Sequence, residues 1–215
     1  RVTDLTEGRI LGFSLSCYST GVYIAVNHRD YKGHPHEANL SKEQVASIFQ
    51  AIKDSGRLVV LANASFDLKA ARLLGFNIRD QIPHCDILMC AWLLARGKRV
   101  KGGLNLKNLS KTIIGKEMMT FAEVASDKNF ELAFNRDQDK SVKYASDDAL
   151  RTKEVWEKML PDLEANDNWL KVFWELETPV TELVAHMGEV GVQIDSEYLT
   201  ELDIQFTEQL TEIGR

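Results

Sequence analysis

The feature that most constrains the fold is a short apolar run followed at once by a helical pattern. Leu58-Val-Val-Leu-Ala62 has the length and uninterrupted apolar character of a strand buried in a sheet that is covered on both faces. Asn63 follows it, and residues 65–74, which end before Gly75, have the pattern of a helix. Strand, short turn and helix in this order indicate an α/β fold, in which functional groups gather at the strand's carboxyl end.

The flanking segments agree with this class. Residues 9–17 and 21–27 are β-rich and are separated by a turn, which predicts a hairpin. Capping boxes or capping residues and terminal glycines predict helices over residues 41–53, 87–95 (capped by Asp86), 104–114, 139–160 (ended by Pro161) and 168–188, with another from Ser196. Thr120-Phe-Ala-Glu123 is a further capping box. We therefore predict an α/β domain over residues 1–165 and a helical piece over residues 166–215.

Two segments are predicted to be irregular. Residues 126–137 are polar and show no period. An earlier loop carries His28, His34 and His36, but no cysteine or carboxylate stands at metal-ligand spacing from them. We therefore expect this histidine-bearing segment to be a solvated loop and not a metal site.

Composition limits the classes of function. The chain has only three cysteines and no apolar run near the roughly 20 residues that span a bilayer, which favours an intracellular protein with no membrane partner. Its net charge of −6 argues against nucleic acid as a partner, unless the acids are gathered at cation sites. A basic run is either a solvated face or a surface that meets DNA; it comprises Arg96, Lys98, Arg99, Lys101, Lys107 and Lys111.

Two pairs of residues carry the candidate chemistry. In the predicted long helix, Tyr144 and Asp148 are four residues apart and lie on one face, while Asp147 is turned away by roughly 100°. A carboxylate beside a phenol is suited to hold a divalent cation and to orient a water. Asn63 and Asp67 are also four residues apart, at the end of the apolar strand, although each residue taken alone is better explained as a helix cap or a first-turn acid.

Together these motifs resemble the 3′–5′ exonuclease domain of family A DNA polymerases, the bacterial DNA polymerase I type. The family's Asn-x-x-x-Asp motif is matched by Asn63-Ala-Ser-Phe-Asp67, and its Tyr-x-x-x-Asp motif by Tyr144-Ala-Ser-Asp-Asp148. The segments beginning at Asp86, Leu104 and Thr120 are also similar. Residues 177–195 resemble the junction at which these polymerases begin the polymerase domain. The resemblance covers nearly the whole chain, in the family's order.

The resemblance implies an RNase H-like fold and hydrolysis of a phosphodiester by two metal ions about 4 Å apart. Asp67 and Asp148 would hold Mg²⁺ or Mn²⁺, and Tyr144 would orient the attacking water. Asn63 and Phe66 would contact a single-stranded or frayed DNA 3′ end. The polymerase domain of the same parent chain would be a further partner, and the location would be the cytoplasm or nucleoid, or an infected host cell for a viral source.

One family motif is missing. The family places Asp-x-Glu on a strand before the hairpin, but this chain offers only Asp4-Leu-Thr-Glu7 there, whose two acids would face opposite ways on a strand. With Arg1 in place of an initiating Met, we expect a fragment that lacks the first strand. The loss would leave unpaired strand edges, and the chain would have little or no nuclease activity.

Two alternatives remain open. One is a catalytically inactive exonuclease fold that serves as a scaffold for the polymerase domain; the presence of all four motif residues argues against it. The other is an exonuclease that trims RNA, and the similarity of residues 177–195 to the polymerase junction argues against that.

Overall fold

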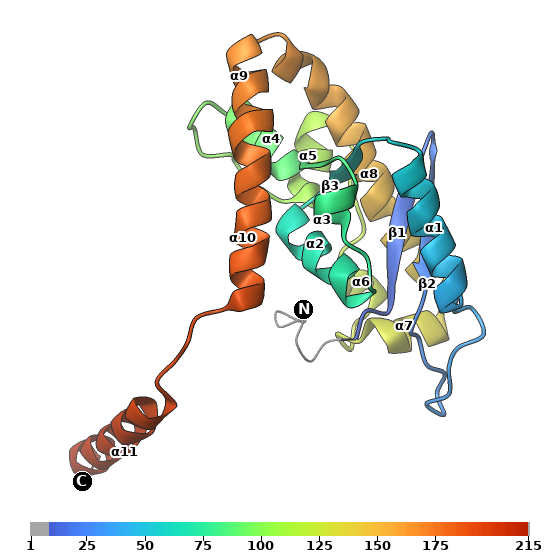
Figure 1. The fold of residues 1–215 in the computed structure, drawn as a ribbon. Coiled ribbons are helices and arrows are strands. Elements are labelled where there is room, and N and C mark those ends of the chain that lie inside the picture. The colour runs from blue at the N-terminus through green and yellow to red at the C-terminus, as the bar shows by residue number, and fades with distance from the viewer. Residues whose placement is uncertain (1–8, 215) are drawn as a thin grey trace.

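The computed structural model describes residues 9–214 and shows helices arranged around two small β-sheets (Figure 1). β1 (Gly12–Cys17) and β2 (Thr20–Ala25) form an antiparallel hairpin in which Gly12 lies opposite Ala25. β3 (Val59–Leu61) and β4 (His84–Asp86) are parallel, with Leu61 opposite Asp86. Within residues 9–214 no strand joins the two sheets. The mixed α/β class predicted from the sequence is confirmed.

Helices make up most of the remaining structure. They are α1 (Lys42–Asp54), α2 (Ala64–Leu73), α3 (Ile78–Gln81), α4 (Ile87–Leu94), α5 (Leu106–Ile113), α6 (Phe121–Val124), α7 (Phe130–Arg136), α8 (Gln138–Glu164), α9 (Asp167–Val172), the π-helical turn η1 (Phe173–Glu177), α10 (Thr178–Val190) and α11 (Ser196–Ile213). The predicted capping boxes of α1 and α6 are both present.

α8 is the central element of the packed part of the structure, which we call the body. It contacts both strands of the hairpin and β3, and it also packs against α4, α5 and α7 (Figure 1). The largest buried cluster includes Ile87 of α4, Leu109 of α5, Val155 and Leu163 of α8, and Phe173 of η1. A second buried cluster joins α1 to α2 and reaches Ala185 of α10. α8 thus holds the hairpin and the parallel sheet in one body.

Two predictions about helices were wrong, one on where α8 ends and one on whether a helix is present. α8 does not end at Pro161 but continues through it to Glu164. A proline costs most in a helix interior, whereas Pro161 lies in the last turn, which Leu163 anchors by complete burial. The segment predicted to be irregular contains α7, because Asn129 caps it and Phe134 is almost fully buried.

The prediction of a solvated histidine loop was also wrong, for His28. This side chain is fully buried, and its Nε2 lies 2.7 Å from the Tyr23 hydroxyl oxygen. Its ring stacks on Phe134 at a centroid distance of 4.0 Å. Burial lowers the pKa of His28 to about 4, so the imidazole is neutral at physiological pH. His34, in contrast, is exposed.

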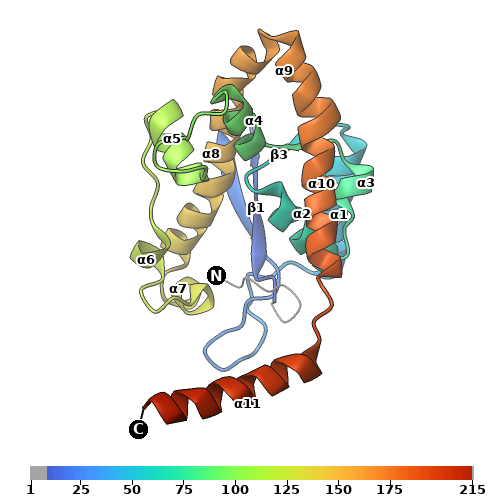
Figure 2. The same ribbon diagram turned by 90° about the vertical axis from the view of Figure 1, so that its left-hand side faces the viewer.

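The C-terminal third contains both packed and unpacked helices. Phe173 of η1 and Ala185 of α10 are buried in the body, whereas α11 contains no buried residue. Figures 1 and 2 show α11 apart from the body, after the break at residues 191–195 that the sequence predicts. The domain boundary at residue 165 stays a prediction. No helix in the described part of the chain is both long enough and apolar enough for a membrane span.

Candidate active site

The strand–turn–helix unit brings three of the predicted residues to one place. Asn63 follows β3 directly, and Phe66 and Asp67 lie in the first turns of α2. Phe66 is 40% exposed, so its ring is accessible, while Asp67 is half-buried. The side chain of Asn63 makes no capping bond to α2 and is exposed. The side chain of Asn63 therefore does not cap α2, which was the other explanation for this residue.

α8 supplies the other two residues. The Tyr144 ring packs between Phe121 and Phe130, at centroid distances of 6.3 and 6.2 Å. Asp148 is half-buried one turn further along the helix. Asp147 is turned away, as predicted, and forms an ion pair with Arg151 at 2.8 Å. The two adjacent acids thus have different surroundings, and Asp148 is the one whose charge acts on Asp67 of α2.

The pKa values of both carboxylates are raised, and the charge of Asp148 contributes to the shift of Asp67. Burial, followed by the negative charges of Asp86 and Asp148, raises the pKa of Asp67 to about 7. Burial also raises the pKa of Asp148 to about 6, with Lys107 opposing the shift and Asp147 adding to it. The charge of Asp148 reaches Asp67 although the residues are 81 positions apart in the sequence. Two acids that burial and neighbouring negative charges keep from full ionisation are suited to bind a cation.

The phenol remains neutral in this setting. Burial, and then the charge of Asp148, raise the pKa of Tyr144 to about 12. At neutral pH its hydroxyl therefore keeps its proton and can both donate and accept a hydrogen bond. This is the property required of a group that orients a water.

Lys107 lies beside two of the candidate site residues, Tyr144 and Asp148, and sequence reasoning did not single it out from the basic run. Its Nζ lies 5.2 Å from the centroid of the Tyr144 ring and donates a hydrogen bond to the Met119 carbonyl oxygen at 2.6 Å. Other members of the run point elsewhere. The Arg96 guanidinium lies over the Trp169 ring at 4.7 Å, and Lys111 pairs with Glu117 at 2.7 Å. The only sequence signal for Lys107 was its membership of the run.

The donor set for a metal is partial in the described residues. Residues 9–214 contain no group of three or more His, Cys, Asp or Glu side chains that could hold a metal ion. Asp67 and Asp148 supply two carboxylates, which are the oxygen ligands that Mg²⁺ and Mn²⁺ take. Asp4 and Glu7, the two acids nearest to the family's first motif, lie outside the described residues.

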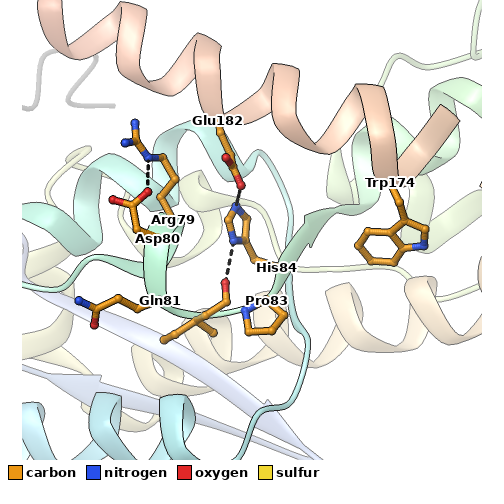
Figure 3. A pocket seen from close by; sticks show the side chains of 8 residues that line it. Arg79, Asp80, Gln81, Pro83, His84, Trp174 and Glu182 are labelled. Carbon is orange, nitrogen blue, oxygen red and sulfur yellow. Dashed lines mark hydrogen bonds and ion pairs between the residues drawn. The ribbon is translucent and has the colours of Figure 1, made fainter. Parts of the chain in front are cut away.

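A separate cavity of about 460 Å³ lies between α3, β4, η1 and α10 (Figure 3). It is lined by Arg79–His84, Trp174 and Glu182, and contains none of the five predicted site residues. At its edge the Nδ1 of His84 donates to the Ile82 carbonyl oxygen at 2.9 Å. The His84 Nε2 lies 3.3 Å from Glu182 Oε1, which is an ion pair when the imidazole is protonated. This contact attaches α10 to β4.

Comparison with known proteins identifies the fold's family. Residues 12–164 match the model of a family described as 3′–5′ exonuclease. Similar curated proteins are DNA polymerase I of Chloroflexus aurantiacus (26% identical, 70% of this chain and 16% of that protein), of Borreliella burgdorferi (25%, 86% and 20%) and of Rhizobium leguminosarum (23%, 93% and 21%). The chain thus spans about a fifth of the length of these relatives. Because the family model covers well over half of the 215 residues, the chain belongs to the 3′–5′ exonuclease family.

Proposed function

We propose that this chain is the proofreading portion of a DNA polymerase I-like protein and acts on a single-stranded or frayed DNA 3′ end. The observation that carries the proposal is that the charge of Asp148 acts on Asp67, although the two acids come from two different helices. Two like charges in a half-buried place are unfavourable, and a bound cation would neutralise them.

Each residue then has a distinct role. Asp67 and Asp148 hold Mg²⁺ or Mn²⁺, with two ions expected in the intact parent. When bound, the ions supply a hydroxide at neutral pH and stabilise the leaving oxygen. Tyr144 orients the attacking water through its neutral hydroxyl, and Lys107 keeps a positive charge beside the phenol and Asp148.

The substrate contacts fall to Asn63 and Phe66. The exposed amide of Asn63 has donors and an acceptor for a terminal nucleotide. The exposed ring of Phe66 offers a surface on which a base or sugar can pack. Packing of this kind is worth about 1–3 kcal/mol per base and tolerates any sequence, as a proofreading site requires.

The expected activity of the chain itself is low. No Asp-x-Glu pair precedes the hairpin in the 215 residues, so two of the four acids that the family uses are missing from this sequence. A site with half of its carboxylates binds Mg²⁺ weakly, and any cleavage by this chain would be slow.

A polymerase domain is the proposed partner. The relatives named DNA polymerase I are about five times as long as the aligned segment. Large apolar side chains on α10 and after it are exposed, among them Leu183, Met187, Val190, Val192 and Ile194. These side chains suit a contact with a further domain. The names of the relatives favour this role over RNA trimming, and an intracellular location follows from the same proposal.

The test of the proposed function is binding of a DNA 3′ end, which does not depend on cleavage. A fluorescent single-stranded oligonucleotide should bind in Ca²⁺ buffer, and Phe66→Ala should weaken binding about tenfold. Leu132→Ala, which removes another 41% exposed apolar side chain, is the control and should have no effect. Equal affinity of the wild type and Phe66→Ala would refute this function for the site.

A further inference from the structure

The backbone at the start of α2 is held by a contact from another element. Asn63 is in the left-handed region (φ 76°, ψ 57°), which asparagine adopts more readily than most residues other than glycine. Asn63 is also the N-cap residue of α2, but its side chain makes no capping hydrogen bond. The first amides of α2 therefore need an acceptor from elsewhere in the chain.

Asp86 is that acceptor. Its side chain is buried at the end of β4, and its Oδ1 accepts the Asn63 amide at 3.1 Å while its Oδ2 accepts the Ala64 amide at 2.8 Å. The same Oδ1 accepts the Leu88 amide at 2.8 Å and so caps α4. The sequence predicts only this last contact. The parallel pairing of Leu61 with Asp86 brings the carboxylate to α2.

This arrangement has two consequences for the site. The Asn63 and Ala64 amides at the start of α2 are already bound to Asp86, so these two amides are not available to a phosphate. The side chain of Asn63 is not needed as a cap; its Oδ1 accepts a hydrogen bond from the Ser65 hydroxyl at 3.3 Å. The turn that carries Asp67 starts from a fixed point.

We propose that Asp86 is a positioning residue: by bridging the start of α2 to the start of α4, it holds Asn63 and Asp67 in place for the cation and the DNA 3′ end. The proposal rests on the proposed function for its consequence, whereas the bridge itself does not depend on that function. Asp86 acts on the site by holding the start of α2, and its negative charge also acts on Asp67.

Asp86→Ser separates the two tasks of the carboxylate. A serine hydroxyl is as good a cap as aspartate for its own helix, so the Leu88 contact is retained. It is too short and has too few acceptors to serve the Asn63 and Ala64 amides as well. Asp86→Asn is the second variant, since its single carbonyl oxygen can serve only part of the set. Ser41→Ala is the control, because it removes the capping box of α1, away from the site.

The first measurement is amide hydrogen exchange of the Asn63 and Ala64 amides. Loss of a hydrogen bond to a charged acceptor should speed exchange about tenfold in Asp86→Ser, with no change there in Ser41→Ala. The second is Mn²⁺ affinity, read from the electron paramagnetic resonance signal of free Mn²⁺. It should fall about tenfold in Asp86→Ser and Asp86→Asn and stay unchanged in Ser41→Ala.

The outcomes distinguish this inference from the proposed function. Unchanged exchange at Asn63 and Ala64 in both Asp86 variants overturns the bridge. Unchanged Mn²⁺ affinity in both, while Asp67→Ala abolishes binding, overturns the positioning role. If Asp67→Ala binds Mn²⁺ like the wild type, the proposed metal site fails, and the exchange result alone decides whether Asp86 fixes α2.

Discussion

At the scale of single residues, the site consists of acids that the fold holds close together. Burial and the negative charges of neighbouring acids raise the pKa values of Asp67 and Asp148. Between about pH 4 and 7 the folded chain therefore binds protons that the unfolded chain has released, so the free energy of unfolding falls as pH rises through this window. Above and below the window these two groups cause no further change. The site thus lowers stability at neutral pH when no cation is present.

Asp67→Asn removes one of these charges with little change in shape. In EDTA at pH 7.5 we expect the variant to be more stable than the wild type by about 1–2 kcal/mol, a figure reduced for partial exposure, and the difference to vanish near pH 4. Urea unfolding at the two pH values measures it. Asp80→Asn is the control, because hydrogen bonds from Asn77 and Arg79 lower the pKa of Asp80, so neutralisation brings no gain there. A wild type more stable than Asp67→Asn at pH 7.5 would contradict the account.

Lys107 is a further single residue that affects the site, through its charge. Its ammonium opposes the effect of burial on Asp148, so Lys107→Met should move the pKa of Asp148 upward from about 6. Lys111→Met is a matched control, since Lys111 lies on the same helix but pairs with the exposed Glu117. Carbon-detected NMR titration of the Asp148 carboxyl measures both variants. If the pKa of Asp148 is the same in Lys107→Met as in the wild type, Lys107 does not act on Asp148.

At the scale of elements, the approach of the hairpin to α8 fixes where Tyr144 and Asp148 lie. Gly21 of β2 comes so close to α8 that a side-chain carbon there would overlap the Ser146 carbonyl oxygen. Ser146 stands between Tyr144 and Asp148 in the sequence. The absence of a side chain at Gly21 is therefore a condition for the position of these two residues.

Gly21→Ala should destabilise the protein by about 1–3 kcal/mol, because backbone must move to make room. Gly188→Ala is the control: it lies in α10, and its added carbon would meet only the flexible end of Lys69, so it should be neutral or slightly stabilising. Thermal unfolding of both variants tests this. Gly21→Ala with wild-type stability would show that α8 and β2 are not held as closely as described.

The sequence predicted what is local to an element and missed what depends on contacts between elements. The spacing of Asn63 and Asp67, and of Tyr144 and Asp148, is a property of single helices. The burial of His28 depends on Phe134, which is far along the chain. The bridge by Asp86 depends on β4, a strand of only three residues that has no detectable period.

At the scale of the whole molecule, the C-terminal helices differ in how they join the body. Phe173→Ala should cost about 3–5 kcal/mol, because its ring is fully buried in the largest core cluster. Removal of residues 196–215 should change the free energy of unfolding by less than about 0.5 kcal/mol, since α11 buries no residue. Urea unfolding compares the two. A large loss on removing α11 would mean that the helix packs on the body in solution.

The central claim, that Asp67 and Asp148 converge on one cation, is tested most directly by Mn²⁺ added in small amounts to the isotope-labelled chain. Paramagnetic broadening of NMR signals falls steeply with distance from the ion. The account predicts that the amide signals of residues 63–67 and 144–148 broaden together, and that Asp67→Ala removes the broadening of both segments. Broadening of one segment alone, or of both in Asp67→Ala, would contradict it.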